Sequence, residues 1–163
     1  AQAHGMVFWD DVVDEVSEEY PGVEVERLLV DAASMDLIRR PDEFDVVVCS
    51  NLFGDILTDV GAIVTGSMGL APSANIDPGN DHPSMFEPVH GSAFDIVGEG
   101  VANPLATVLS GSMLFDHLGE EAAASALWDA VAEQLADEAA PRTPDLGGDS
   151  TTETVATDLR DRL

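Results

Sequence analysis

Two aspartates four residues apart are the side chains in this sequence best suited to binding a metal ion. Asp55 and Asp59 fall within a predicted helix, so they share one face of it. Paired carboxylates of this kind suit a hard cation such as Mg²⁺ or Mn²⁺. Because 32 of the 163 residues are acidic, the spacing by itself is more typical of a solvated acidic face.

The place of this pair in the predicted fold favours a metal site. The helix follows a Val-rich segment that reads as a buried strand, and ligands of open α/β sheets bind at the carboxyl ends of the strands. Asp31 takes the equivalent place after the preceding predicted strand. The sequence therefore predicts three candidate metal ligands, which are Asp31, Asp55 and Asp59.

A second group of chemically capable residues lies between Glu87 and Asp95, in the run Glu-Pro-Val-His-Gly-Ser-Ala-Phe-Asp. Small residues here would let the backbone approach a flat or phosphorylated ligand closely. His90 alone is more often structural than functional. An aspartate such as Asp95 in a nucleotide loop can accept hydrogen bonds from ribose hydroxyls and would repel a 2′-phosphate. No G-x-G-x-x-G follows a predicted strand, so the usual Rossmann fingerprint is absent.

The elements that must position these residues follow a layered α/β pattern. Periodicity predicts helices over 6–20, 31–39, 53–65, 103–118 and 120–139, and strands over 23–30 and 45–49. The alternation of strand and helix between 23 and 65 indicates a βαβ-type arrangement. Residues 66–100 are rich in Gly, Pro, Ser and Asn, with a short strand at Met85 and Phe86, and so long an irregular stretch is usually functional.

Short capping patterns predict where two of the helices start. Asn103 is predicted as an N-cap, with Pro104 at the first helical position. Residues 150–153 read Ser-Thr-Thr-Glu, which is a capping box opening a terminal helix.

The charge balance limits the possible partners. The sequence has 32 Asp and Glu against six basic residues, all Arg, which gives a net charge of −26. Such a charge repels nucleic acids and anionic membranes. Because the acids are spread along the whole chain and would repel one another, a salt-rich cytoplasm is the economical explanation, with an acidic partner-binding domain as the alternative.

The remaining composition indicates a soluble, cytoplasmic protein. Cys49 is the only cysteine, which excludes an intrachain disulfide, and it is predicted to be buried after a Val run. No segment reads as a signal peptide or a transmembrane helix. The first residue is Ala1 and not Met, which suggests that the chain is cut from something longer.

Several motifs, in order along the chain, carry a resemblance to one family. They are Asn51-Leu-Phe-Gly-Asp-Ile-Leu-Thr-Asp59, Phe86-Glu-Pro-Val-His-Gly-Ser-Ala93 and Ala102-Asn-Pro104, with Val30-Asp-Ala32 and Thr143-Pro-Asp-Leu-Gly-Gly148 at the two ends. The sequence resembles the isopropylmalate, isocitrate, tartrate and homoisocitrate dehydrogenases, and within them looks most like 3-isopropylmalate dehydrogenase. The resemblance implies this family's layered α/β fold, of which the chain would hold the C-terminal half.

The resemblance also implies roles for individual residues. Asp55 and Asp59 would bind Mg²⁺ or Mn²⁺ with Asp31 of the partner subunit, since the family's active site straddles a dimer. A homodimer is the expected assembly, and a tetramer is the alternative. Glu87 would approach the nicotinamide of NAD, and Asp95 would accept the ribose hydroxyls, as in NAD-dependent members. The adenosine half of NAD would be held by His90, Gly91, Ser92, Ala93 and Asn103.

The implied activity is NAD-dependent oxidative decarboxylation of a 2-hydroxy acid that bears a β-carboxylate, with the metal as Lewis acid. The expected substrate is 3-isopropylmalate, an intermediate of leucine biosynthesis. Tartrate, isocitrate or homoisocitrate dehydrogenase, a non-catalytic regulatory subunit, and an acidic α/β interaction domain are the alternatives.

The chain departs from the family pattern in three ways. Phe94 stands where most relatives have Pro, and residues 77–84 are longer and more acidic than usual. The family's catalytic Lys and Tyr have no counterpart, because the chain lacks Lys and its single Tyr20 lies in another context.

Those residues belong to the family's N-terminal half, so the chain alone is predicted to be inactive and poorly folded. Residues 1–65 would belong to the second, dimer-forming and metal-binding domain. Residues 66–163 would belong to the first, NAD-binding domain.

Overall fold

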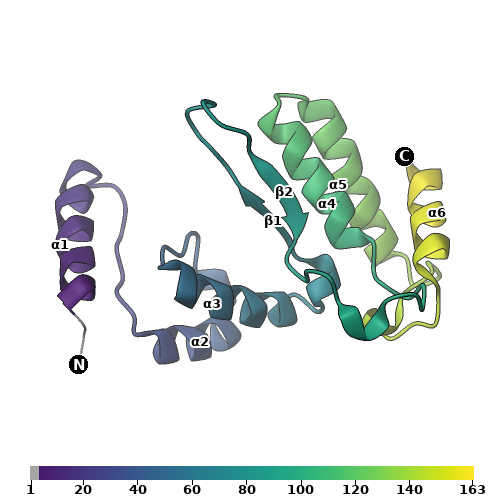
Figure 1. Cartoon of the computed structure of the whole chain (residues 1–163), viewed down its shortest axis with the longest axis horizontal. Coiled ribbons are helices and arrows are strands. Elements are labelled where there is room, and N and C mark those ends of the chain that lie inside the picture. The colour runs from purple at the N-terminus through teal and green to yellow at the C-terminus, as the bar shows by residue number, and fades with distance from the viewer. Residues whose placement is uncertain (1–3) are drawn as a thin grey trace. The chain divides into compact units, whose positions relative to one another are not determined.

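The computed structural model describes residues 4–163, which separate into two compact units. The first unit ends at Ala33 and the second comprises Ser34–Leu163. The helices and strands are α1 (His4–Glu19), α2 (Val30–Arg39), α3 (Asn51–Val64), β1 (Pro72–Asn75), β2 (Met85–Pro88), α4 (Leu105–His117), α5 (Glu121–Ala136) and α6 (Thr152–Arg162) (Figure 1). The predicted domain boundary near residue 65 remains a prediction.

The first unit is built around α1, whose predicted apolar stripe is formed but not buried. Phe8 is 70% exposed and Val16 is 48% exposed, and none of the described residues of α1 is buried. After the helix the chain runs extended, and Arg27 makes an ion pair back to Asp14. Because both side chains of this pair are largely exposed, it contributes little to stability.

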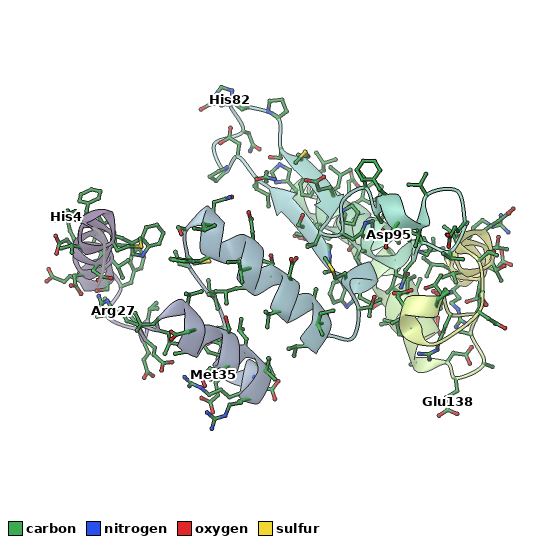
Figure 2. The ribbon with its side chains drawn as sticks, turned by 60° about the horizontal axis from the view of Figure 1, so that its bottom comes forward. His4, Arg27, Met35, His82, Asp95 and Glu138 are labelled. Atoms are coloured by element: carbon green, nitrogen blue, oxygen red, sulfur yellow. The ribbon has the colours of Figure 1, made fainter. Side chains whose placement is uncertain are left out.

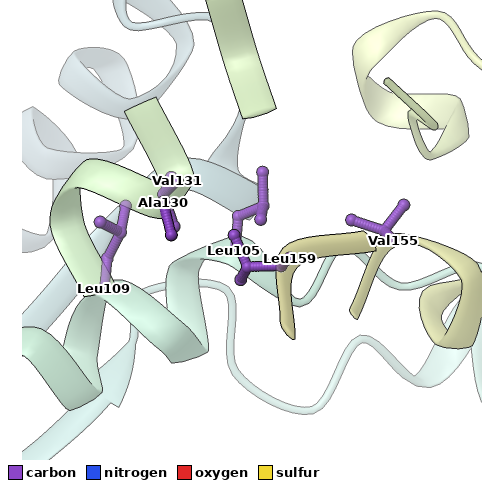
Figure 3. Packing of buried hydrophobic residues seen from close by; sticks show 6 residues of the cluster. All are labelled: Leu105, Leu109, Ala130, Val131, Val155 and Leu159. Carbon is purple, nitrogen blue, oxygen red and sulfur yellow. The ribbon is translucent and has the colours of Figure 1, made fainter. Parts of the chain in front are cut away.

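The packed core of the second unit lies where α4, α5 and α6 meet. Figure 3 shows the six buried side chains of this cluster, which are Leu105, Leu109, Ala130, Val131, Val155 and Leu159. The loop between α4 and α5 is short and turns at Gly119, whose φ of +78° favours glycine. A buried hydroxyl also joins the two helices, since Ser112 Oγ donates to the Ala124 carbonyl oxygen at 2.8 Å.

A two-stranded antiparallel hairpin packs against α4. Pro72 pairs with Pro88, and Asn75 pairs with Met85. Phe86 of β2 contacts His117 of α4, with ring centroids 5.5 Å apart. The hairpin therefore fixes the start of the Glu87–Asp95 segment on the α4 core.

The long loop that joins the two strands is organised by one carboxylate. Asp77 accepts hydrogen bonds from the backbone N–H groups of His82, at 2.7 Å, and Gly79, at 3.1 Å. These bonds lower the pKa of Asp77, the one from His82 most strongly. Figure 2 shows His82 at the tip of this loop.

Two predicted strands are wrong. Residues 23–29 and 45–49 have no strand partner among residues 4–163 and are irregular. A strand exists only where a neighbour completes its backbone hydrogen bonds, and sequence periodicity cannot supply that neighbour. The Val run is correspondingly open, with Val46 at 81% and Val48 at 73% exposure, and Cys49 is half-buried.

The helix starts differ slightly from prediction. The N-cap position of α4 is Pro104, one residue later than predicted, and the helix begins at Leu105. Asn103 Oδ1 nevertheless accepts from the Leu105 N–H at 3.0 Å. The cap of α6 is Thr151, which accepts from the Thr154 N–H, and Ser150 lies outside it. Among the residues that the structure describes, no helix is long and apolar enough to cross a membrane.

An apolar cavity of about 650 Å³ lies within the second unit. Its walls come from α3, α4, α5 and the turn before β1, and include Leu57, Leu70, Leu109, Trp128 and Val131. Trp128 is 55% exposed even though it lines this cavity. The packing between α3 and the α4–α5 pair is therefore incomplete.

Candidate functional site

The predicted metal-binding pair lies on an exposed face of α3. The helix begins after Ser50, whose carbonyl oxygen accepts from the N–H groups of Phe53 and Gly54. Asp55 and Asp59 follow one turn apart, and both are exposed. Asn51 Nδ2 donates to Asp55 Oδ2 at 3.2 Å, which leaves the carboxylate open to further ligands. This face can therefore offer two hard oxygen donors to a cation.

The third predicted ligand, Asp31, belongs to the other compact unit. It lies in the first turn of α2 and is exposed, and its Oδ1 accepts from the Ala32 N–H at 2.9 Å. Within residues 4–163, no group of three or more His, Cys, Asp or Glu side chains could hold a metal. The pair on α3 would thus need ligands from beyond the described residues, such as a substrate or a second subunit.

The predicted cofactor loop leaves β2 with an open, irregular backbone. Gly91 has φ of +61° and nothing within 4 Å of the position where a Cβ would stand. Ala93 also takes the left-handed conformation, with φ of 40°, which is uncommon for a residue with a side chain. Such conformations present backbone groups outward, so the loop can approach a ligand closely.

The polar side chains of this loop are accessible. Glu87 and Asp95 are exposed, as is Ser92, while His90 is half-buried. His90 Nδ1 lies 2.9 Å from the Gly91 carbonyl oxygen, a contact in which the ring N–H donates. Figure 2 labels Asp95, which lies in a short 3-10 helix, Phe94–Ile96. Phe94, the departure from the family pattern, is 87% exposed.

Asn103, the last predicted cofactor residue, differs from the others because its side chain is buried. It is 7% exposed, its Oδ1 accepts from the Leu105 N–H, and its Nδ2 donates to Asp145 Oδ2 at 2.9 Å. Its amide is therefore already engaged within the protein. Any cofactor contact at this position would fall to the backbone.

Asp145 is a residue of this region that the sequence did not single out. It lies in a 3-10 helix, Pro144–Leu146, far along the chain from Asn103. The same Oδ2 accepts from Ser67 Oγ at 2.5 Å. The only sequence signal was its place in the Thr143–Gly148 motif, and nothing in that motif indicates which residues its carboxylate contacts.

Comparison with known proteins identifies the class. The model of the isocitrate/isopropylmalate dehydrogenase family matches residues 2–161. The chain belongs to this family.

Its relatives act on different substrates. The chain is 48% identical over 155 residues to a probable tartrate dehydrogenase/decarboxylase of Agrobacterium vitis, covering 95% of this chain and 43% of the relative. It is 52% identical over 155 residues to a 3-isopropylmalate dehydrogenase of Thermobifida fusca, covering 95% and 42%. The chain thus spans less than half the length of these relatives.

Solved structures of the family share the fold. An isocitrate dehydrogenase from Methylococcus capsulatus superposes with a TM-score of 0.87 at 42% identity, covering 93% of this chain and 44% of that one. A β-decarboxylating dehydrogenase from Thermococcus kodakarensis superposes with a TM-score of 0.81 at 41% identity, covering 98% and 46%. The chain therefore has part of the family's α/β fold, as predicted, with several helices and a small sheet.

Proposed function

We propose that the protein containing this chain is an NAD-dependent β-decarboxylating dehydrogenase, an oxidoreductase that oxidises and decarboxylates a 2-hydroxy acid bearing a β-carboxylate. The observation that carries the proposal is the pair Asp55 and Asp59, which stands exposed one turn apart on α3 of a chain from this family. A protein that had lost this chemistry would have no need to keep both carboxylates free.

Mg²⁺ or Mn²⁺ fits the donor set that the chain offers. Asp55 and Asp59 supply exposed carboxylate oxygens, which hard cations prefer, and Asp31 of the partner subunit would complete the set in a homodimer. When bound, the cation supplies Lewis-acid polarisation of the substrate's hydroxyl oxygen. The carboxylates of this chain hold it in place and offset its charge.

NAD fits the open loop after β2. The uncovered backbone at Gly91, with Ser92 and Ala93, offers a surface for the adenosine, and His90 flanks it. Asp95 is free to accept the ribose hydroxyls and would repel the 2′-phosphate of NADP. Glu87, exposed on β2, lies toward the nicotinamide end in this proposal. NAD, when bound, accepts the hydride.

The substrate we propose is 3-isopropylmalate, which would place the protein in leucine biosynthesis in the cytoplasm of a salt-adapted organism. The Phe53-Gly54-Asp55 run and the 52% identity to the Thermobifida fusca enzyme support this choice. Tartrate is the second candidate, favoured by the relatives from Agrobacterium vitis and Bacillus subtilis at 48% and 46% identity.

We also propose how the chain contributes to the whole enzyme. Residues 1–65 belong to the dimer-forming, metal-binding domain and 66–163 to the NAD-binding domain. Because the chain has no Lys and spans less than half of its relatives, it is expected to be inactive alone. The exposed apolar side chains of α3, among them Leu52 and Ile63, would be covered in the dimer or a tetramer.

The test is NAD reduction by the full-length protein that carries this chain, in molar KCl with Mn²⁺. The substrates are 3-isopropylmalate, tartrate, isocitrate and homoisocitrate, each also tried with NADP. Turnover of 3-isopropylmalate with NAD is the expected result. Turnover of another acid alone would keep the reaction and change the substrate. Tight Mn²⁺ binding without any turnover would instead indicate a regulatory subunit.

A further inference from the structure

Three chain segments meet at one carboxylate oxygen in the second unit. Asp145 Oδ2 accepts from Ser67 Oγ at 2.5 Å and from Asn103 Nδ2 at 2.9 Å. Ser67 in turn accepts from the Gly69 N–H at 2.9 Å. The turn before β1, the segment before α4 and the loop before α6 are therefore joined through Asp145.

The contact between these segments is too close for any side chain at Gly69. A Cβ there would stand 2.6 Å from Asn103 Cβ and 2.7 Å from Asp145 Oδ2. Real Cβ contacts are longer, so only glycine fits. The loop that carries Asp145 is equally tight, because a Cβ on Gly148 would lie 2.0 Å from the Arg142 carbonyl oxygen. Asp145 is thus held in place by the fold itself.

The segment that precedes α4 is fixed from the other side as well. The Thr152 N–H donates to the Gly100 carbonyl oxygen at 2.8 Å, and Thr152 Oγ1 donates to the Ala102 carbonyl oxygen. Asn103 itself has both ends of its amide engaged inside the protein. What this segment can still offer to a ligand is its backbone, in an orientation set by Thr152 and Asp145.

We propose that Asp145 is a positioning residue for NAD binding, which acts through the side chain of Asn103 and does not touch the cofactor. The proposal rests on the proposed function, in which the Asn103 segment contacts the adenosine. Asn103 contributes backbone groups to the cofactor, while its amide serves as the link to Asp145. Ser67 shares the same oxygen but belongs to the turn before β1 and donates to Asp145 rather than to Asn103, so its loss leaves Asn103 its partner.

The charge state of Asp145 suits this role. Burial is the largest single influence and acts to raise its pKa, but the hydrogen bonds that the carboxylate accepts, from Ser67 and Asn103 among others, together lower the pKa below the ordinary value of 3.8. The residue as a whole keeps contact with solvent, while Oδ2 faces inward to its donors. An ionised acceptor makes the stronger hydrogen bond to the Asn103 amide.

The test compares two ways of breaking the same cluster. Asp145→Ala removes the acceptor of Asn103, and Ser67→Ala removes the other donor while leaving Asn103 its partner. NAD affinity and Mn²⁺ affinity are measured by calorimetry on the full-length protein in molar KCl. We expect Asp145→Ala to raise the Kd for NAD about tenfold. Ser67→Ala should change it less than about twofold, and neither variant should change Mn²⁺ affinity.

Asp145→Asn serves as the conservative variant, because it keeps an oxygen acceptor without the charge. Its Kd for NAD should fall between those of the wild type and Asp145→Ala, and it decides the question if Asp145→Ala does not fold. Unchanged NAD affinity in the Asp145 variants, or an equal loss in Ser67→Ala, would overturn the positioning role. Failure of the wild type to bind NAD would overturn the proposed function and this inference with it.

Discussion

Helices α3 and α4 are both rich in apolar residues, yet the chain covers them to different extents, with two residues of α3 buried and five of α4. In α4, Leu105 is 2% exposed and Leu109 is 6% exposed, because α5 and α6 pack over them. In α3, Leu52 is 67% exposed and Ile63 is 65% exposed. From composition alone, the apolar side chains of both helices would be expected to be buried to the same extent. Helix α4 thus finds its partners within this chain, whereas part of the apolar surface of α3 stays exposed.

The two proposed ligand sites divide in the same way. The candidate metal ligands Asp55 and Asp59 lie on the more exposed helix, and the proposed NAD-binding segment at Asn103 leads into the more buried one. A site that is completed by another subunit belongs on a surface that another subunit will cover. A site for a soluble cofactor can instead be prepared by one chain.

The sharpest way to test this division is to remove one metal ligand. Asp55→Asn in the full-length protein should lower kcat/KM by about a thousandfold, since Lewis-acid stabilisation amounts to several kcal/mol. The thermal midpoint without metal should stay within about one degree, because exposed substitutions rarely change stability. Asp129→Asn, at an exposed acid on α5, is the matched control and should keep full activity. Equal losses of activity in both variants would show that Asp55 is not a ligand of the proposed metal site.

The core around α4 can be tested by truncating one buried side chain. Leu105→Ala should lower the free energy of unfolding by about 3 kcal/mol, through lost burial and the cavity left behind. Leu118→Ala, at a 63% exposed position just after α4, should cost less than about 0.5 kcal/mol. Urea titration of the full-length protein in molar KCl measures both. Similar costs would mean that the α4–α6 cluster is not the core of this region.

Hydrogen exchange compares the two helices directly. In the chain expressed alone, the amides of α4 should exchange at least about tenfold more slowly than those of α3, because buried contacts protect helical hydrogen bonds. In the full-length protein the contrast should largely disappear. Equal protection of α3 in the isolated chain would contradict the claim that it depends on outside partners. A cooperative unfolding transition of the isolated chain would likewise contradict the prediction that it folds poorly.

Acid titration tests the cluster at Asp145. The pKa of Asp145 is lowered in the folded state, so its contribution is complete above pH 3.8 and is lost as the pH falls through the lower folded value. Wild type should exceed Asp145→Asn by about 1 kcal/mol near neutral pH, a hydrogen-bond value reduced for solvent contact. The gap should close below pH 3.8. A gap that does not vary with pH would show that the carboxylate charge is unimportant.

The smallest expected effect concerns the ion pairs at the end of α6. Arg162 donates to Asp158 and Asp137, each at 2.8 Å, and these bonds lower the pKa of both carboxyls. Arg162→Ala should lower the urea midpoint less than Leu105→Ala does. The effect should shrink further in molar KCl, which screens such pairs. A loss that does not depend on salt would indicate that the stem of Arg162 contributes by packing.

The helices were predictable because each carries its own signal. Periodic apolar residues and local caps placed α1, α3, α4 and α5 within a few residues of their observed ends. The strands were not predictable in this way, since the Val run before α3 has the composition of a strand but no neighbour among residues 4–163. Strand β1 was missed for the opposite reason: its Pro-Ser-Ala-Asn sequence reads as a loop, and only pairing with β2 makes it a strand.

Sequence reasoning could name candidate site residues, which stay predictions, but not their internal contacts. Spacing and motif placed Asp55, Asp59 and the loop at Gly91, and these lie exposed on elements that can present them. The sequence could not show that Asn103 turns its amide inward or that Asp145 receives it, because the two are 42 residues apart. Contacts of this kind depend on how loops pack together in the tertiary structure. Neither periodicity nor a short motif predicts that packing.

Tryptophan fluorescence can report on the incompletely packed cavity. The chain has only two tryptophans, Trp9 on α1 and Trp128 on the cavity wall, one in each compact unit. An indole that is half in water emits at longer wavelength than one enclosed by apolar groups. With Trp9 replaced by Phe, the emission of Trp128 becomes a gauge of whether anything has closed over the cavity. The emission wavelength of Trp128 would therefore shorten when another part of the protein covers the cavity.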